Sequence, residues 1–240
     1  MSGFNNKHQD SIDWSLRMSE QAAAARDSRL RTFYESGSFS KETPLKEVSF
    51  VALDFETTGL NAKKDDIVSI GLVPFTLQRI YCKEAKQWIL NPRQHLAEES
   101  VVIHGITHSD IDNAPDLMGV LEPLLKALAG RVVVVHYRYM EREFLNEVLI
   151  KRLGEGVYFP VVDTMDLEAR VYRNGFTALC LRLIGRKRAS IRLSDSRTRY
   201  SLPFYRQHEA LTDAIATAEL LQAQIAHRYS PDTPISDLWL

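Results

Sequence analysis

A change in the spacing of apolar runs limits the folds open to this chain more than any other feature. Three apolar runs come first, separated by short gaps, which is typical of an antiparallel meander. Later β-branched runs alternate with helical patterns, which indicates parallel strands joined by crossover helices. The predicted strands are residues 48–54, 67–75, 87–91, 132–135 and 161–162, and the predicted helices are residues 97–104, 116–128, 140–151 and 209–227. The sequence therefore predicts an α/β fold with one mixed sheet flanked by helices.

The composition narrows the class of protein. Of 240 residues, 45% are hydrophobic and 25% are charged, which excludes a disordered chain. The 30 basic side chains nearly cancel the 31 acidic ones, so no global field indicates nucleic acid or a membrane. Only Cys82 and Cys180 are present, which argues against a disulfide scaffold. Because no apolar run could span a bilayer and the first residues lack a signal-peptide core, we expect a cytoplasmic protein with no membrane partner.

We expect three parts in the chain. They are an N-terminal helical extension and linker at residues 1–46, a main domain at residues 47–229 and a C-terminal tail at residues 230–240. Apolar residues recur at roughly helical spacing between Ser11 and Tyr34, which predicts a helix, and Gly37 and Pro44 end the pattern. This helix either packs on the main domain or serves as a partner-binding arm.

Two acidic side chains stand at the end of the first predicted strand. Side chains alternate along a strand, so Asp54 and Glu56 lie on one face and Phe55 lies on the other. Neighbouring carboxylates repel each other and cost free energy unless a positive charge lies between them. A divalent cation meets that need, and oxygen ligands favour magnesium or manganese. The alternative is that both acids simply face water.

A second candidate cluster opens the last predicted helix. His208 stands at or just before the helix start, and Asp213 follows about one turn further in. This spacing can direct both side chains toward one pocket. Taken alone, His208 is better explained as a surface or capping histidine and Asp213 as a solvated helix residue.

Three motifs occur in a fixed order along the chain. They are Asp54-Phe-Glu-Thr-Thr-Gly59, His136-Tyr-Arg-Tyr-Met-Glu-Arg-Glu-Phe-Leu145 and His208-Glu-Ala-Leu-Thr-Asp213. Together they resemble the DEDD superfamily of 3′-to-5′ exonucleases, in its histidine-containing (DEDDh) branch, over about residues 50–227. The resemblance implies a ribonuclease H-like fold, a mixed five-stranded sheet flanked by helices, to which the N-terminal helical extension is added. The same resemblance implies that residues 47–229 form a 3′–5′ exonuclease domain.

The middle motif departs from the family pattern at its acidic residue. His136 and Phe144 fix the alignment, so the family's second aspartate falls on Glu141, and Tyr137 also replaces a typical residue. Glutamate keeps the charge and both oxygens but reaches one methylene further, and magnesium tolerates poor geometry less well than other ions. Glu141 is the predicted ligand, since Glu143 would face a different side of a helix.

The resemblance implies two-metal phosphodiester hydrolysis. The two divalent ions, Mg²⁺ or Mn²⁺, would be held by Asp54, Glu56, Glu141 and Asp213. His208 would be the general base that deprotonates the attacking water, and an unperturbed histidine pKa of roughly 6.5 suits that role. The implied contacts to the terminal nucleotide are Thr57, Leu60, His104 and Ile106. Leu60 and Ile106 are equally well explained as ordinary core residues.

Two further segments point to partners. Basic residues are concentrated between Arg182 and Arg206, directly before the third motif, which favours phosphate steering over a mobile solvated loop. The tail segment at residues 235–239 loosely resembles peptides that hold bacterial sliding clamps, so a replication clamp or polymerase is a candidate partner. The alternative for the tail is that Leu238 and Trp239 fold back on the domain.

Two functions stay open on the sequence alone. The first is a metal-dependent 3′–5′ exonuclease that releases nucleoside monophosphates from single-stranded or frayed 3′ ends of DNA or RNA, with DNA favoured. The second is a non-catalytic nucleic-acid or polymerase-binding module, disabled by Glu141 in place of aspartate. The intact acids Asp54, Glu56 and Asp213, together with His208, favour the first.

Overall fold

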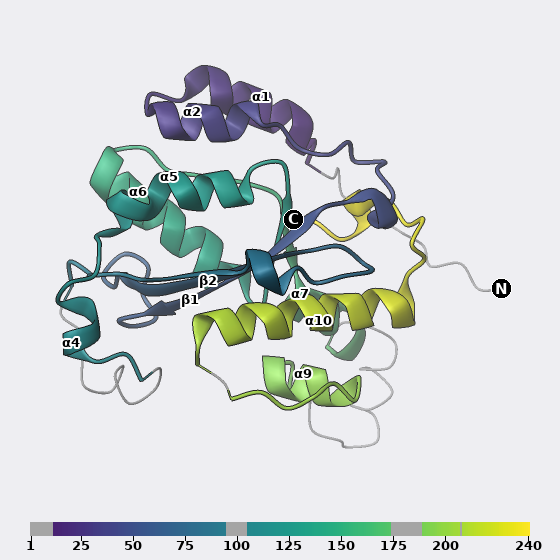
Figure 1. The fold of residues 1–240 in the computed structure, drawn as a ribbon. Coiled ribbons are helices and arrows are strands. Elements are labelled where there is room, and N and C mark those ends of the chain that lie inside the picture. The colour runs from purple at the N-terminus through teal and green to yellow at the C-terminus, as the bar shows by residue number, and fades with distance from the viewer. Residues whose placement is uncertain (1–11, 95–104, 174–188, 207) are drawn as a thin grey trace.

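The protein folds around one mixed sheet with helices on both faces (Figure 1). The structure is a computed structural model that describes residues 12–94, 105–173, 189–206 and 208–240. The strands are β1 (Phe50–Thr57), β2 (Ile67–Phe75), β3 (Lys86–Ile89), β4 (Val132–Val135) and β5 (Val161–Asp163), in the order β3-β2-β1-β4-β5. β2 is antiparallel to β1 and β3, whereas β4 is parallel to β1 and β5. This arrangement confirms the predicted ribonuclease H-like sheet.

Helices cover the sheet on each side. The helices are α1 (Trp14–Ala24), α2 (Ser28–Glu35), α4 (His108–Ile111), α5 (Leu117–Leu128), α6 (Phe144–Leu153), α7 (Thr164–Tyr172), α9 (Leu193–Arg199) and α10 (Ala210–Arg228), with a π-helical turn η3 (Tyr139–Glu143) before α6 and short 3-10 turns at Leu45–Glu47, Cys82–Glu84 and Ile235–Asp237. In Figure 1, α5 and α6 lie on one side of the sheet and α10 on the other. The helix predicted at residues 97–104 lies outside the described residues. No helix in the described part of the chain is long and apolar enough to cross a bilayer.

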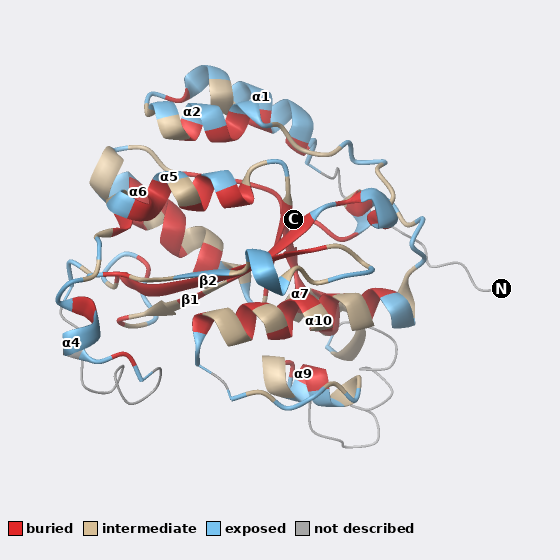
Figure 2. Cartoon of the chain, viewed as in Figure 1, coloured by how far each residue is buried: buried red, intermediate tan, exposed pale blue. Residues whose placement is uncertain are grey.

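Alternation along β1 decides which core each side chain joins. Most of β1 is buried (Figure 2). Val51, Leu53 and Phe55 are buried against the helices α5 and α6, whereas Phe50 and Ala52 are buried in the cluster that includes α10. Because every second residue points the same way, the acidic side chains that follow at alternate positions belong to the α10 face. The period of the strand thus directs both acids toward the helix that carries the third motif.

The N-terminal extension is a helical hairpin rather than the single helix predicted for residues 11–34. The chain breaks between α1 and α2, where the Asp27 carboxylate accepts a hydrogen bond from the Arg29 amide at 2.9 Å and caps α2. The Glu155 carboxylate, far away in sequence, accepts hydrogen bonds from the amides of Arg26 and Asp27 at 3.1 Å. The local spacing of apolar residues could not reveal this remote partner, and Leu16, placed on the apolar face by that spacing, is exposed.

The C-terminal tail is part of the core. Ile235, Leu238 and Trp239 are buried in the α10-side cluster. The Leu240 amide donates a hydrogen bond to the Val161 carbonyl at 2.9 Å, at the outer edge of β5. The fold-back alternative is therefore the one that the structure shows, and the side chains that a clamp contact would need are covered.

Candidate active site

The third motif reaches the sheet because one strand residue lacks a side chain. Gly71 of β2 lies opposite Asp54 in the register. A Cβ atom on Gly71 would stand 2.2 Å from the backbone carbonyl carbon of Ala210, the first residue of α10. Only glycine permits this approach, which brings the start of α10 beside the acidic end of β1. Sequence reasoning missed Gly71, although an isolated glycine in an apolar strand is a signal of close backbone approach.

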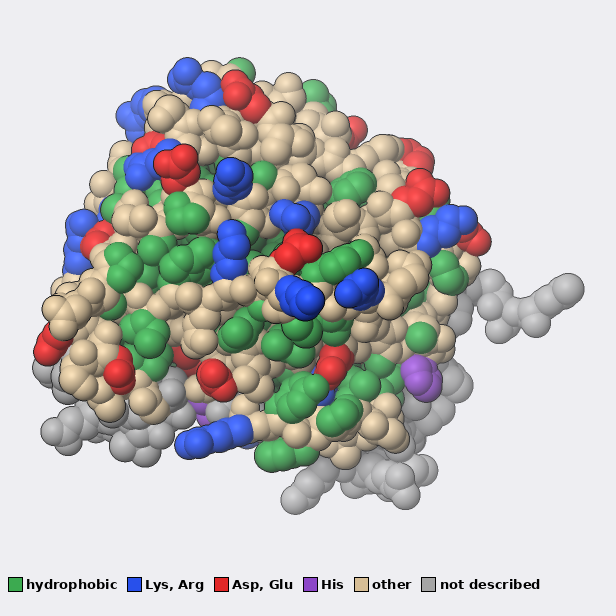
Figure 3. Space-filling model, viewed as in Figure 1, with side chains coloured by type: hydrophobic (Ala, Val, Ile, Leu, Met, Phe, Trp, Pro, Cys, Tyr) green, Lys and Arg blue, Asp and Glu red, His purple; other side chains and the backbone are tan. Residues whose placement is uncertain are grey.

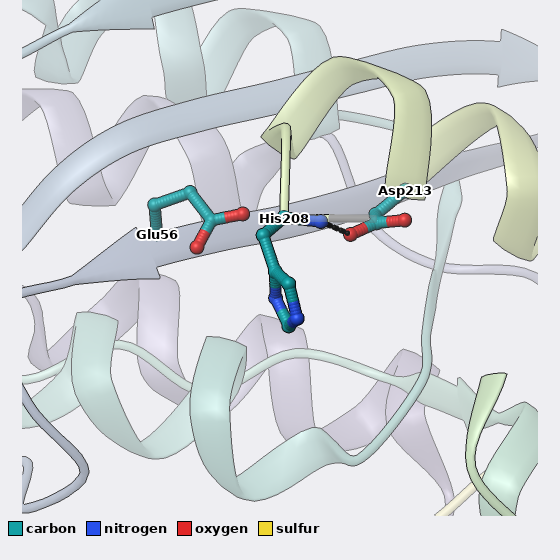
Figure 4. Close-up of side chains that lie close together, drawn as sticks. All are labelled: Glu56, His208 and Asp213. Atoms are coloured by element: carbon teal, nitrogen blue, oxygen red, sulfur yellow. Dashed lines mark hydrogen bonds between the residues drawn. The ribbon is translucent and has the colours of Figure 1, made fainter. Parts of the chain in front are cut away.

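Three predicted site residues lie close together where β1 meets α10 (Figure 4). One ligand atom each from Glu56, His208 and Asp213 lies within 4.8 Å of the others. The His208 amide donates a hydrogen bond to Asp213 Oδ2 at 2.8 Å. His208 has φ of +67°, a conformation that few non-glycine residues adopt, and its side chain is exposed. Asp213 is buried, so the pair joins a fixed carboxylate to an imidazole open to solvent.

Glu141 comes from the segment after β4 and is not one of the three residues whose ligand atoms lie within 4.8 Å of one another. It lies in the π-helical turn η3, which contacts β1, and its side chain is only 2% exposed. Burial raises the pKa of Glu141 well above its ordinary value, and the negative charges of Asp54, Asp163 and Glu56 raise it further. The Glu141 carboxylate therefore lies near Asp54 rather than turned away from it.

The other acids repel one another in the same way. The pKa of Asp54 is raised well above its ordinary value, first by burial and then by the charges of Asp213 and Glu56. Burial, followed by the charge of Asp213, raises the pKa of Glu56 to about 7. Burial also raises the pKa of Asp213. Each of the four carboxylates thus has a raised pKa, although the hydrogen bond from the His208 amide and the charges of His208 and Arg197 offset part of the effect at Asp213.

The residues present fit divalent cations. Glu141 Oε2 is buried and, within the described part of the chain, has no hydrogen-bond partner. A buried carboxylate oxygen without a partner costs free energy. The potential ligands of the cluster are all carboxylate oxygens apart from the neighbouring imidazole, which is the set that magnesium or manganese prefers. The roles of Asp54, Glu56, Glu141 and Asp213 as ligands, and of His208 as base, stay predictions.

A buried carboxylate shapes the turn that leads to Glu141. Asp163, at the end of β5, accepts hydrogen bonds from the amides of Tyr137 and Arg138, each at 3.0 Å. Its Oδ1 also accepts the Met165 amide and caps α7. The sequence did not reveal this role of Asp163, because the contact joins segments that only the sheet brings together.

His136, the first residue of the middle motif, is a structural residue in this fold. Burial lowers the pKa of His136 to about 4, so the imidazole is neutral at pH 7. Its ring nitrogens lie 2.8 Å from the Thr164 hydroxyl and 3.0 Å from the Ile191 carbonyl oxygen. These contacts join β4 to the start of α7 and to the segment before α9.

The predicted nucleotide contacts differ in their surroundings. Leu60, in the loop after β1, is 79% exposed, whereas Ile106 packs in a small apolar cluster with Val68. The Thr57 hydroxyl donates a hydrogen bond to the Gly59 carbonyl at 2.6 Å. His104 lies outside the described residues. Contact of these residues with a nucleotide stays a prediction.

Two arginines of the predicted basic stretch form ion pairs inside the fold. Arg197 is buried and pairs with Glu219 at 2.7 Å, and Arg199 pairs with the buried Glu168. These two guanidinium groups hold α9 against α10 and α7, so phosphate steering cannot be assigned to them. Arg206 is exposed, and residues 182–188 of the stretch lie outside the described part. On the face in Figure 3, basic and acidic side chains are interspersed.

A family model and curated relatives match the part of the chain that holds this site. The family model described as Exonuclease (RNase_T) matches residues 51–221. The chain belongs to the exonuclease family. A DNA polymerase III subunit epsilon-like protein of Rhodobacter capsulatus is 33% identical over 181 residues, which cover 74% of this chain and 24% of that protein. The DNA polymerase III subunit epsilon of Treponema pallidum is 28% identical over 76% of this chain and 79% of its own length.

The chain is much shorter than some of these relatives, and solved structures agree with its fold. It spans 12% of the PolC-type DNA polymerase III of Thermotoga petrophila, at 29% identity. The nuclease domain of 3′hExo, a DEDDh family member bound to rAMP, has a TM-score of 0.62 at 15% identity, covering 75% of this chain and 92% of that one. Exonuclease X in complex with 5′ overhanging duplex DNA has a TM-score of 0.58 at 19% identity, covering 78% and 98%. At such identities the likeness concerns the fold.

Proposed function

We propose that this exonuclease-family protein is a metal-dependent 3′–5′ exonuclease. Its substrate would be single-stranded or frayed nucleic acid, with DNA favoured, and its products nucleoside monophosphates. One observation carries the proposal: Glu56, His208 and Asp213 offer ligand atoms within 4.8 Å of one another at the end of β1. The buried carboxylates of Asp54 and Glu141 lie near enough to Glu56 for charge repulsion to raise their pKa values, and Glu141 Oε2 lacks a partner in the described part. The preference for DNA draws support from the relatives named as DNA polymerase III subunits.

The residues divide the work of hydrolysis as follows. Asp54, Glu56, Glu141 and Asp213 would hold two divalent cations, Mg²⁺ or Mn²⁺. When bound, such ions stabilise the negative charge that develops on the attacking and leaving oxygens. His208 would take a proton from water as the water oxygen attacks the scissile phosphorus. The bond from phosphorus to the 3′ oxygen of the preceding nucleotide breaks, that oxygen gains a proton, and the terminal nucleotide leaves as a 5′-monophosphate.

The exposure of His208 suits this proton transfer. Its ring is open to solvent, so a proton taken from the attacking water can pass on to bulk water. The hydrogen bond from its own amide to Asp213 fixes the backbone on which the imidazole stands. This hydrogen bond thereby fixes the position of His208 relative to the Asp213 carboxylate.

A labelled single strand tests the proposal directly. The oligonucleotide carries its label at the 5′ end and is incubated with protein in Mg²⁺ or Mn²⁺, with and without chelator. A metal-dependent ladder is the expected result, and a label moved to the 3′ end should be released first as a mononucleotide. Asp213→Asn should abolish the ladder, whereas Glu209→Gln, one turn away and exposed, serves as the matched control. Matched RNA strands measure the preference for DNA.

The same assay decides against the proposal if the strand stays intact in both metals. An intact strand with a shifted gel band would favour the non-catalytic binding module. A clamp or polymerase contact through the tail would require Ile235, Leu238 and Trp239 to leave the core, so the proposed function rests on residues outside the tail. A cytoplasmic location and the domain boundaries after residues 46 and 229 stay predictions.

A further inference from the structure

Two exposed tyrosines stand side by side next to the acidic cluster. Tyr137 is 46% exposed and Tyr139 is 40% exposed. Their ring centroids lie 5.9 Å apart and their planes differ by 33°, which is within the usual range for aromatic pairs. Although the rings contact each other, a large part of each remains open to solvent. The pair therefore presents aromatic surface that a planar ligand can cover.

The backbone that presents this pair is strained and firmly held. Tyr137 has φ of +95°, which is a genuine outlier for a residue with a bulky side chain. Two hydrogen bonds from the amides of Tyr137 and Arg138 to the buried Asp163 carboxylate keep the turn in this conformation. Strain of this kind persists only where the surroundings enforce it, and it is concentrated at ligand sites. The turn is thus held in one defined conformation by its hydrogen bonds to Asp163.

The strand order places this turn at the cluster. β4 is parallel to β1, with Val134 opposite Ala52, so the chain leaves β4 next to the acidic end of β1. From Tyr137 the chain continues directly into η3, which contacts β1 and holds Glu141. The tyrosines therefore border the carboxylates instead of lying on a remote face.

We propose that Tyr137 and Tyr139 form a stacking platform for the nucleobases that precede the 3′-terminal nucleotide of a single strand. The inference rests on the proposed function, which it extends from the scissile bond to the adjoining bases. Stacking on aromatic rings accepts any base, because each base has a π-face. Arg138, between the two tyrosines, lies 3.7 Å from the Asp163 carboxylate through Nη1, yet its side chain is 42% exposed, so its free edge can approach the backbone phosphates of the same strand. The platform would hold the strand without reading its sequence.

Abasic oligonucleotides separate stacking from phosphate binding. Fluorescence anisotropy in Ca²⁺ compares a 5′-labelled oligodeoxyadenylate with one that is abasic at the second and third positions from the 3′ end, after a check that both remain intact. We expect the protein to bind the abasic strand at least about 30-fold more weakly, as the loss of two stacked bases predicts. A variant with Tyr137→Asn and Tyr139→Ala should bind both strands equally weakly. Asparagine tolerates positive φ, so the turn is preserved.

Matched variants show whether weaker binding comes from the loss of the rings or from misfolding. Tyr137→Phe with Tyr139→Phe keeps both rings and should retain the difference between the strands, and Tyr139→Ala alone tests the platform without altering the strained residue. Tyr81→Ala serves as the control, because the Tyr81 amide bonds to Pro74 at the opposite end of the β1–β2 pair. Thermal unfolding checks that each variant is folded.

The outcomes distinguish the platform from the nuclease. Equal binding of both strands by the unaltered protein, or an unchanged difference in the variant that lacks both rings, would overturn the platform even if the protein cuts DNA in Mg²⁺. A protein that discriminates between the strands through these rings but never cuts would instead remove the proposed exonuclease function and leave the platform standing.

Discussion

Removing the metal should make the stability of this protein depend on pH in a direction set by the acidic cluster. Burial and the charge of Asp213 raise the pKa of Glu56 from 4.5 to about 7. A carboxyl whose pKa is raised by folding contributes stability below its unfolded pKa, and that stability is lost as the pH rises through the folded pKa. At about 1.4 kcal/mol per pKa unit, Glu56 alone lowers the free energy of unfolding by about 3 kcal/mol between pH 4.5 and pH 8. The raised pKa values of Asp54 and Glu141 act in the same direction.

His136 acts in the opposite direction and must be separated from the cluster. Burial lowers the pKa of His136 from 6.5 to about 4. A histidine with a lowered pKa is protonated more readily in the unfolded chain, so stability is lost as the pH falls from about 6.5 to about 4. Its contribution is also about 3 kcal/mol, so a single pH series without metal would mix two opposing effects. Because His136 is not a predicted ligand, its effect cancels in the difference between metal-loaded and metal-free protein.

The assay is urea unfolding followed by tryptophan fluorescence at pH 5 and pH 8, in saturating Mg²⁺ and in chelator. The stabilisation by Mg²⁺ should be larger at pH 8 by about 3 kcal/mol or more. Glu56→Gln, which removes one charge from the cluster, should stabilise the metal-free protein at pH 8, whereas Glu20→Gln on the exposed part of α1 should change nothing. A Mg²⁺ stabilisation that is the same at both pH values, or a Glu56→Gln variant that is less stable than the parent without metal, would refute the reasoning.

Four other changes test separate parts of the site and fold. Gly71→Ala would place a Cβ atom 2.2 Å from the Ala210 backbone, so unfolding assays should find it destabilised by about 1–3 kcal/mol, with nuclease activity lost as α10 is displaced. His208→Ala should lower kcat about 10²- to 10⁴-fold while Mg²⁺ still stabilises the fold, and a lost Mg²⁺ effect would argue against its role as a base. Glu141→Asp, although it restores the family residue, should cut more slowly than the parent in a labelled-strand assay, and a faster variant would contradict this. Trp239→Ala should lower the free energy of unfolding by about 3–5 kcal/mol, and a change below 1 kcal/mol would mean that the tail is not part of the core.

The sheet and the acidic pair could be predicted because both depend on short-range periodicity. The alternation that buries Phe55 on one side of β1 and turns Asp54 and Glu56 to the other is visible in the sequence itself. The short connections between the first three strands predicted that they are antiparallel, and the helices between the later strands predicted that those are parallel. The three ordered motifs then predicted which acids, far apart in the sequence, share one site.

The features that escaped prediction all depend on contacts between distant segments. The carboxylate of Glu155 breaks the N-terminal helix by accepting amides at the α1–α2 junction, more than a hundred positions away. The sequence left the packing of the tail open because its buried partners lie on β5 and around Leu45, where the Leu45 amide donates to the Thr233 carbonyl. The hydrogen bonds of Asp163 to the turn after β4 follow only from the pairing of β4 with β5.

The glutamate at the middle motif and the shape of the helix around it are best understood together. Glu141 extends one methylene further than the aspartate of the resembled pattern, and it lies within the π-helical turn η3 that precedes α6. A π turn closes its hydrogen bond one residue later than an α turn and widens the helix locally, often at functional sites. The longer side chain on the wider turn still lies close enough to Asp54 for the charge of Asp54 to raise the pKa of Glu141. The glutamate is thus not turned away from the other acids, which is what the alternative of a disabled site would have required.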